Sequence, residues 1–297
     1  MPSPDNIIRQ FSGSAGHLTV QTWEQSNDTR KIIVFAHGGG QTRHSWRRTA
    51  NRLHTEGWAV ATYDARGHGD SAWSSSCDYG LEHQADDVIA VVEQLNEALD
   101  KKFQIRANTP RRPVLVGASM GGAASLIGQS RCPELASALV LVDVVPRVEH
   151  KGLQRVRDFL SDTADGFNDI HEVAQAVTAY NHHRIAKPRP EGLRKNVRER
   201  NGRLHWHWDP EFISSGQVDQ TRLAHQLEEA ALGITVPTLL IRGANSDIVS
   251  PDGAAQLQEL IPHAQVSTIA DVGHMVAGDD NDQFTSQLND FLDQQLF

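Results

Sequence analysis

The chain has 297 residues, a formal net charge of −9 at pH 7 and 39% hydrophobic residues. This composition is ordinary for a globular protein. The negative net charge and the absence of blocks of like charge disfavour a nucleic-acid-binding surface. No apolar stretch approaches the length of a membrane span, and the first residues lack the pattern of a secretory signal. The two cysteines form neither a disulfide framework nor a metal-binding pattern. We therefore expect a cytoplasmic protein that needs no metal or other cofactor.

Short apolar runs alternate with amphipathic stretches along most of the chain. The runs typical of strands cover residues 17–25, 31–37, 58–64, 113–119, 138–144, 235–243 and 264–270. Helical patterns cover residues 81–99, 252–261 and 281–296. Strands that alternate with helices predict an α/β fold, with a mostly parallel, doubly wound sheet and helices on both faces.

Residues 146–232 interrupt this alternation, since they show helical patterns and polar loops but no run typical of a buried strand. We expect residues 1–145 and 233–297 to form a core domain and residues 146–232 to form a mostly helical cap, or lid. Trp206 and Trp208 in this segment are candidates for the wall of a substrate pocket, although packing of the cap on the core is an equally simple role.

A serine lies between glycines where a predicted strand ends. The segment "GASMGG", residues 117–122, matches G-x-S-x-G between an apolar run and a helical stretch. A loose turn is one interpretation. In the other, a tight turn exposes the hydroxyl of Ser119 as a nucleophile, and the amide of Met120 at the helix start stabilises a developing oxyanion.

A serine nucleophile needs a base, and a base needs an acid that orients it. His274 follows the run at 264–270, and Asp247 follows the run at 235–243, so both are placed in late loops. Asp143 also ends a predicted strand and is an alternative to Asp247 as the acid. We expect a triad of Ser119, His274 and Asp247.

The segment "FAHGGGQTRHSW", residues 35–46, supplies glycines after an early strand. Gly39 is the candidate for the second oxyanion donor, because its amide is not covered by a side chain. A phosphate-binding loop is the competing interpretation, but the Lys and Ser or Thr that it requires are absent. The same segment holds our other candidates for substrate contacts: His37, Gly38, Gly40 and Trp46.

These segments together resemble the α/β-hydrolase superfamily, in the branch that has a helical cap. "HGGGQTRHSW" at 37–46, "DARGHGDS" at 64–71 and "GASMGG" at 117–122 match its motifs, and the loops are similar to those of epoxide hydrolases and haloperoxidase-like members. Epoxide hydrolases and haloalkane dehalogenases of this branch carry an aspartate at the nucleophile position. Serine there implies attack on a carbonyl instead.

The resemblance implies a serine hydrolase that cleaves carboxylic esters or lactones through an acyl-enzyme. Carbon–carbon bond hydrolases and cofactor-free haloperoxidases use the same triad and stay open as alternatives, as does a non-catalytic ligand receptor. The expected partner is a small ester or lactone, without nucleic acid or membrane, and a homodimer is possible.

Overall fold

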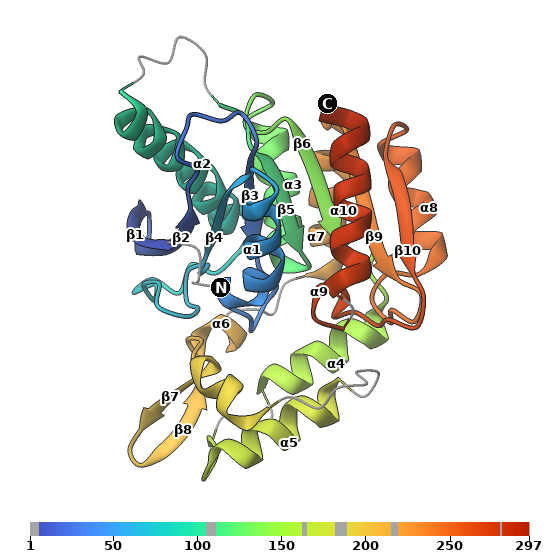
Figure 1. Cartoon of the computed structure of the whole chain (residues 1–297). Coiled ribbons are helices and arrows are strands. Elements are labelled where there is room, and N and C mark those ends of the chain that lie inside the picture. The colour runs from blue at the N-terminus through green and yellow to red at the C-terminus, as the bar shows by residue number, and fades with distance from the viewer. Residues whose placement is uncertain are drawn as a thin grey trace.

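The structure is a computed structural model, and it describes residues 6–104, 111–161, 165–181, 189–214, 219–279 and 281–296. An eight-stranded sheet forms its centre, with helices on both sides and a group of smaller elements beyond one end (Figure 1). None of the described helices has the length and apolarity required to cross a lipid bilayer.

The sheet has the strand order β1-β2-β4-β3-β5-β6-β9-β10. The strands are β1 (Asn6–Gly13), β2 (Gly16–Trp23), β3 (Ile32–Ala36), β4 (Ala59–Tyr63), β5 (Val114–Ala118), β6 (Ala138–Val142), β9 (Thr238–Gly243) and β10 (Gln265–Ile269). Strand β2 pairs antiparallel with both β1 and β4, whereas β4, β3, β5, β6, β9 and β10 pair in parallel. The predicted α/β fold with a mostly parallel sheet is therefore confirmed.

Two apolar layers cover the faces of the sheet. On one face pack α2 (Leu81–Phe103), α3 (Met120–Arg131), α7 (Gln220–Leu232) and α8 (Pro251–Leu260). On the other face pack α1 (Arg47–Thr55) and α10 (Asn281–Leu296), with the short helix α9 (Val276–Asp279) beside them. The central strands β3, β4 and β6 are buried throughout and almost entirely apolar, because helices cover both of their faces.

The segment between β6 and β9 contains a third apolar cluster of its own. Its elements are α4 (His150–Ser161), α5 (Ile170–Tyr180), η2 (Pro190–Asn196), β7 (Val197–Arg200), β8 (Arg203–Trp206) and α6 (Glu211–Ser214). They lie together beyond one end of the sheet (Figure 1). The strands β7 and β8 form an antiparallel hairpin that the sequence pattern did not predict. Helix α7 lies at the end of the expected cap range but packs on α3 of the core. We therefore call only the elements from α4 to α6 the cap.

Candidate active site

Ser119 stands at the turn between β5 and α3. Its backbone has φ 46° and ψ −116°, which a residue with a side chain rarely adopts. Its amide donates to the carbonyl of Val142 at 3.0 Å, and its carbonyl accepts from the amide of Ala123 at 2.9 Å. The surrounding hydrogen bonds hold the strained turn, and strain of this kind is concentrated at functional sites.

Glycines next to Ser119 allow the backbone to approach its neighbours closely. A Cβ on Gly117 would lie 2.5 Å from backbone atoms of Gly121 and Gly122. A Cβ on Gly121 would lie 2.6 Å from the carbonyl oxygen of Ala36, at the end of β3. Any larger residue would have to move backbone, so the glycines are required by a tight turn and not by a loose one.

His274 follows β10, and its ring contacts the carboxylate of Asp143. Nδ1 donates to Oδ2 at 2.7 Å. Asp143 is fully buried at the end of β6 and also accepts from the amide of Gly243 at 3.1 Å and the hydroxyl of Ser246 at 2.5 Å. A proton on Nδ1 leaves Nε2 of the neutral ring free to accept another proton.

His274 and Ser119 line the same cavity. Within the described part of the chain, no hydrogen bond joins their side chains. Catalytic hydrogen bonds are often long in the free enzyme and shorten when substrate binds, so this arrangement is compatible with proton transfer between the two residues.

The structure contradicts the expected pairing of Asp247 with His274. Asp247 accepts two hydrogen bonds from the guanidinium of Arg155 on α4, at 2.6 and 2.8 Å. Partial burial alone would raise the pKa of Asp247, but Arg155 holds it below its ordinary value. Arg155 also donates to the carbonyl of Tyr180 at 2.9 Å. Asp247 therefore ties α4 to the core, and Asp143, the alternative acid, takes the position beside His274.

The three glycines after β3 differ in what their amides contact. The amide of Gly38 donates to Oε1 of Gln41 at 3.3 Å, and that of Gly40 donates to Nε2 of His68 at 3.1 Å. The amide of Gly39 has no acceptor among the residues that the structure describes. Gly39 is thus the one glycine of this loop whose amide is available to a ligand.

The amide of Met120 is the second candidate donor. Met120 is the first residue of α3, and the first amides of a helix have no acceptor within it. A Cβ built on Gly39 would lie 3.9 Å from Sδ of Met120, and one built on Gly38 would lie 3.5 Å from Cβ of Ser119. Residues 38–40, which we call the glycine loop, and the start of α3 therefore face each other beside Ser119.

His37 does not line the cavity, which contradicts the substrate contact that we expected from the sequence. Its side chain is buried, Nδ1 donates to the carbonyl of Gly38 at 2.8 Å, and Nε2 accepts from the amide of Ala65 at 3.0 Å. Burial lowers the pKa of His37 to about 4, so the ring is neutral at pH 7. His37 thus links the glycine loop at Gly38 to the buried loop at Ala65, on the side away from the cavity.

His68 and His207 extend this buried histidine cluster toward the cap. Their ring centroids are 5.9 Å apart, and those of His37 and His68 are 5.2 Å apart. His207 precedes α6, and its Nδ1 accepts from the amide of Gly69 at 2.8 Å. Burial lowers the pKa of His68 to about 3 and that of His207 well below 6.5. Three neutral rings therefore connect the cap to the glycine loop, a connection that no sequence signal indicated.

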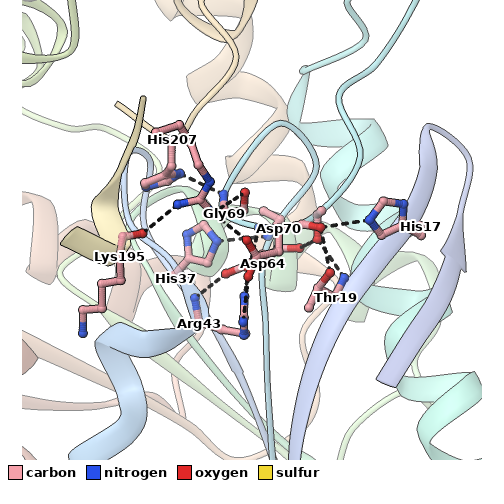
Figure 2. Close-up of polar contacts among 12 residues, drawn as sticks. His17, Thr19, His37, Arg43, Asp64, Gly69, Asp70, Lys195 and His207 are labelled. Carbon is pink, nitrogen blue, oxygen red and sulfur yellow. Dashed lines mark hydrogen bonds and ion pairs between the residues drawn. The ribbon is translucent and has the colours of Figure 1, made fainter. Parts of the chain in front are cut away.

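Asp64 organises the loop at residues 64–71, as Figure 2 shows. Its carboxylate accepts from the amide of Arg43 at 2.7 Å and from that of Asp70 at 2.9 Å. The guanidinium of Arg43 forms ion pairs with both Asp64 and Asp70. At Gly69, φ is 55° and a Cβ would overlap the Asp64 carboxylate. This loop braces the glycine loop and carries His68.

A cavity of about 1640 Å³ lies between the cap and the end of the sheet that carries Ser119. Trp206 and Trp208 line it, and their rings stack with centroids 4.9 Å apart. Trp208 also lies against the glycine loop, because a Cβ on Gly40 would be 3.3 Å from its ring. The structure therefore places both tryptophans at the cavity.

Trp46 borders the same cavity but is packed as a core residue. It is 1% exposed, and its ring lies 4.9 Å from that of Phe35 and 5.7 Å from that of Phe284. The ring of Trp46 therefore packs in the core beneath the glycine loop and offers almost no surface to a ligand. In the described ranges of the chain, no group of three or more His, Cys, Asp or Glu side chains is placed to hold a metal ion.

The sequence model of the family described as alpha/beta hydrolase fold matches residues 31–280. The chain belongs to the α/β-hydrolase family. The sn-1-specific diacylglycerol lipase ABHD11 of Mus musculus is 27% identical over 269 residues, which cover 89% of this chain and 81% of the lipase. Esterase Rv0045c of Mycobacterium tuberculosis is 27% identical over 272 residues, which cover 89% of this chain and 83% of the esterase.

Among solved structures, E-2-(acetamidomethylene)succinate hydrolase superposes with a TM-score of 0.80 at 20% identity. The superposition covers 97% of this chain and 100% of that hydrolase. At this identity the likeness concerns the fold alone, and it confirms that this α/β-hydrolase has the arrangement of sheet and flanking helices described above.

Proposed function

We propose that this α/β-hydrolase cleaves carboxylic esters or lactones through an acyl-enzyme. Oγ of Ser119 attacks the carbonyl carbon while Nε2 of His274 takes its proton. Asp143 keeps the other ring proton on Nδ1 and stabilises the imidazolium that forms. The protonated His274 then gives its proton to the departing alcohol oxygen as the ester bond breaks.

The second half of the reaction reverses these roles. Water attacks the acyl carbon and gives a proton to Nε2 of His274, and Oγ of Ser119 leaves with that proton. In both halves the carbonyl oxygen becomes an oxyanion. The amides of Gly39 and Met120 are its proposed donors, and one such donor is typically worth about 3 to 4 kcal/mol of barrier.

One observation carries this proposal: the buried pair of His274 and Asp143 opens on the same cavity as the strained Ser119. A protein that only binds a ligand does not require this combination of nucleophile, base and acid. The names of the two relatives, a diacylglycerol lipase and an esterase, support ester cleavage over the other reactions that such a triad can perform.

The test is a panel of p-nitrophenyl esters and lactones of graded acyl length, with epoxides and haloalkanes as controls. We expect turnover of esters or lactones, no turnover of the controls, and loss of turnover in Ser119→Ala. Equal turnover by Ser119→Ala, or turnover confined to the control substrates, would refute the proposal.

A further inference from the structure

Several cationic side chains at the cavity wall form no ion pair with a carboxylate that the structure describes, although Glu82, Asp158 and Asp219 also line the cavity. Arg157 on α4, Arg189 just before η2 and Lys195 at the end of η2 all line the cavity. None of the three forms an ion pair with a residue that the structure describes. The chain has 37 acidic residues against 28 basic ones, so unpaired cations at one cavity call for an explanation.

Two other cations on the same segments are paired. Arg155, two residues before Arg157 on α4, binds Asp247, and Arg198, three residues after Lys195, binds Asp70 at 2.5 Å. Carboxylates are therefore within reach of the same segments, yet none that the structure describes forms an ion pair with Arg157, Arg189 or Lys195.

The backbone at Lys195 is held in place while its side chain is left free. Its carbonyl accepts from Arg198 at 3.2 Å. Figure 2 shows that the side chain of Lys195 extends away from the carboxylates of Asp64 and Asp70. The ammonium group therefore points away from these two carboxylates, and it forms no ion pair with any acidic residue that the structure describes.

Further basic groups surround Lys195. Although Lys195 is exposed, partial loss of hydration and the neighbouring Arg47 lower its pKa. Burial, Arg43 and Lys195 lower the pKa of His44 to about 4, so its ring is neutral at pH 7 and can donate a hydrogen bond. His44 lines the same cavity. A bound anion would relieve the repulsion among these cations.

Apolar side chains of the cavity wall lie against the glycine loop. A Cβ on Gly40 would lie 2.5 Å from Cδ2 of Leu160 and 3.3 Å from the ring of Trp208, and both side chains line the cavity. Arg157 precedes Leu160 by one helical turn of α4 and so lies on the same face of that helix. The cavity therefore offers an apolar wall near the reacting centre and positive charge on the same cap elements.

We propose that the cavity selects anionic esters, in which an apolar segment next to the reacting carbonyl leads to a carboxylate or phosphate held by Lys195, with Arg157 and Arg189 adding positive charge. This inference rests on the proposed function for the reaction itself and deepens it by naming the substrate class.

The experiment compares three p-nitrophenyl esters of one acyl length, whose far end is a free carboxylate, its neutral methyl ester, or a phosphate. For the unmodified protein we expect kcat/KM to be higher for an anionic ester than for the neutral one by about tenfold. The two anionic esters show which anion is preferred. About 0.5 M salt should reduce the preference, because salt screens charges at a solvent-exposed site.

Variants assign the preference to the cavity. Lys195→Gln should lower kcat/KM for the anionic esters and leave the neutral ester unchanged, Lys195→Arg should retain the preference, and Arg157→Gln should weaken it. Lys101→Gln on α2 makes the same change of net charge away from this cavity and should have no effect. Equal kcat/KM for anionic and neutral esters, or an equal loss for both in Lys195→Gln, would overturn the proposal.

A binding measurement separates this proposal from the proposed reaction. Calorimetry with Ser119→Ala and an amide analogue of the anionic ester should show binding that Lys195→Gln weakens, whether or not the unmodified protein hydrolyses esters. If neutral and anionic esters both resist hydrolysis while this binding persists, the reaction is wrong and the anion site stands. Binding that is indifferent to Lys195 refutes the anion site.

Discussion

The carboxylate of Asp143 lies 2.7 Å from Nδ1 of His274, although 131 residues separate the two in the chain. The strand order explains this proximity, because β6, which precedes Asp143, lies beside β9, and β9 lies beside β10, which precedes His274. The ends of these three neighbouring parallel strands carry the acid and the base to the same edge of the sheet.

The first prediction concerns Asp143. Asp143→Asn should lower kcat by about 10⁴-fold, because the amide can no longer hold the tautomer of His274 that leaves Nε2 unprotonated. Steady-state kinetics on the best p-nitrophenyl ester measures this loss. A kcat within tenfold of the unmodified enzyme would remove Asp143 from the triad.

Asp247→Asn should behave differently, since Asp247 binds Arg155 and not the histidine. We expect a KM raised a few-fold through looser docking of α4, with kcat changed less than tenfold. Arg155→Gln should have the same effect, and the double variant should be no worse than either single variant. Loss of kcat on the scale predicted for Asp143→Asn would restore Asp247 as the acid.

The buried histidines predict an acid-sensitive fold. Burial holds the pKa of His37 at about 4 and that of His68 at about 3, against an ordinary value near 6.5. In the unfolded chain they take up protons below pH 6.5, so the stability present above pH 6.5 decreases as pH falls toward 4. Between pH 6.5 and pH 5, each of these two histidines should lower the free energy of unfolding by about 2 kcal/mol.

Urea unfolding at pH 7 and pH 5 measures this loss, and His68→Gln is the informative variant. Glutamine keeps an acceptor for the amide of Gly40 but does not titrate, so the dependence on pH should become weaker. An unfolding free energy that is equal at pH 7 and pH 5, or an unaltered pH dependence in His68→Gln, would contradict this account of the cluster.

The glycine loop gives a matched pair of substitutions. Gly40→Ala places a side chain at φ 72° and 2.5 Å from Leu160, so it should distort the loop and lower kcat/KM by about 10²-fold. Gly39→Ala meets no atom closer than 3.4 Å and should retain most of the activity. Thermal unfolding of both variants controls for stability. Equal activities of the two variants would show that the loop does not position an oxyanion donor.

The sequence predicted the sheet and the nucleophile turn because both depend on local patterns. Continuous apolar runs mark strands covered on both faces, and the glycines around Ser119 mark a backbone that no side chain can enter. Asp143 and Asp247 both follow a strand, so position in the chain could not rank them. The choice depends on Arg155, which reaches Asp247 from the cap, and such a contact has no sequence signature.

The cap was the least predictable region for a related reason. Its hairpin of β7 and β8 turns at Asn201 and Gly202, both with positive φ, which is the Asn-Gly signal of a two-residue hairpin loop. The flanking strands have the sequences VRER and RLHW, and neither contains an apolar run that would indicate a strand. His68 and His207 are 139 residues apart and meet only through packing of the cap on the core.

Labelling with a fluorophosphonate, followed by intact mass and peptide mapping, tests the proposed reaction most directly. We expect one adduct per chain on Ser119, with no adduct in Ser119→Ala and greatly slowed labelling in His274→Ala. A protein that remains unlabelled while folded, or that carries the adduct on another residue, would contradict the proposed reaction.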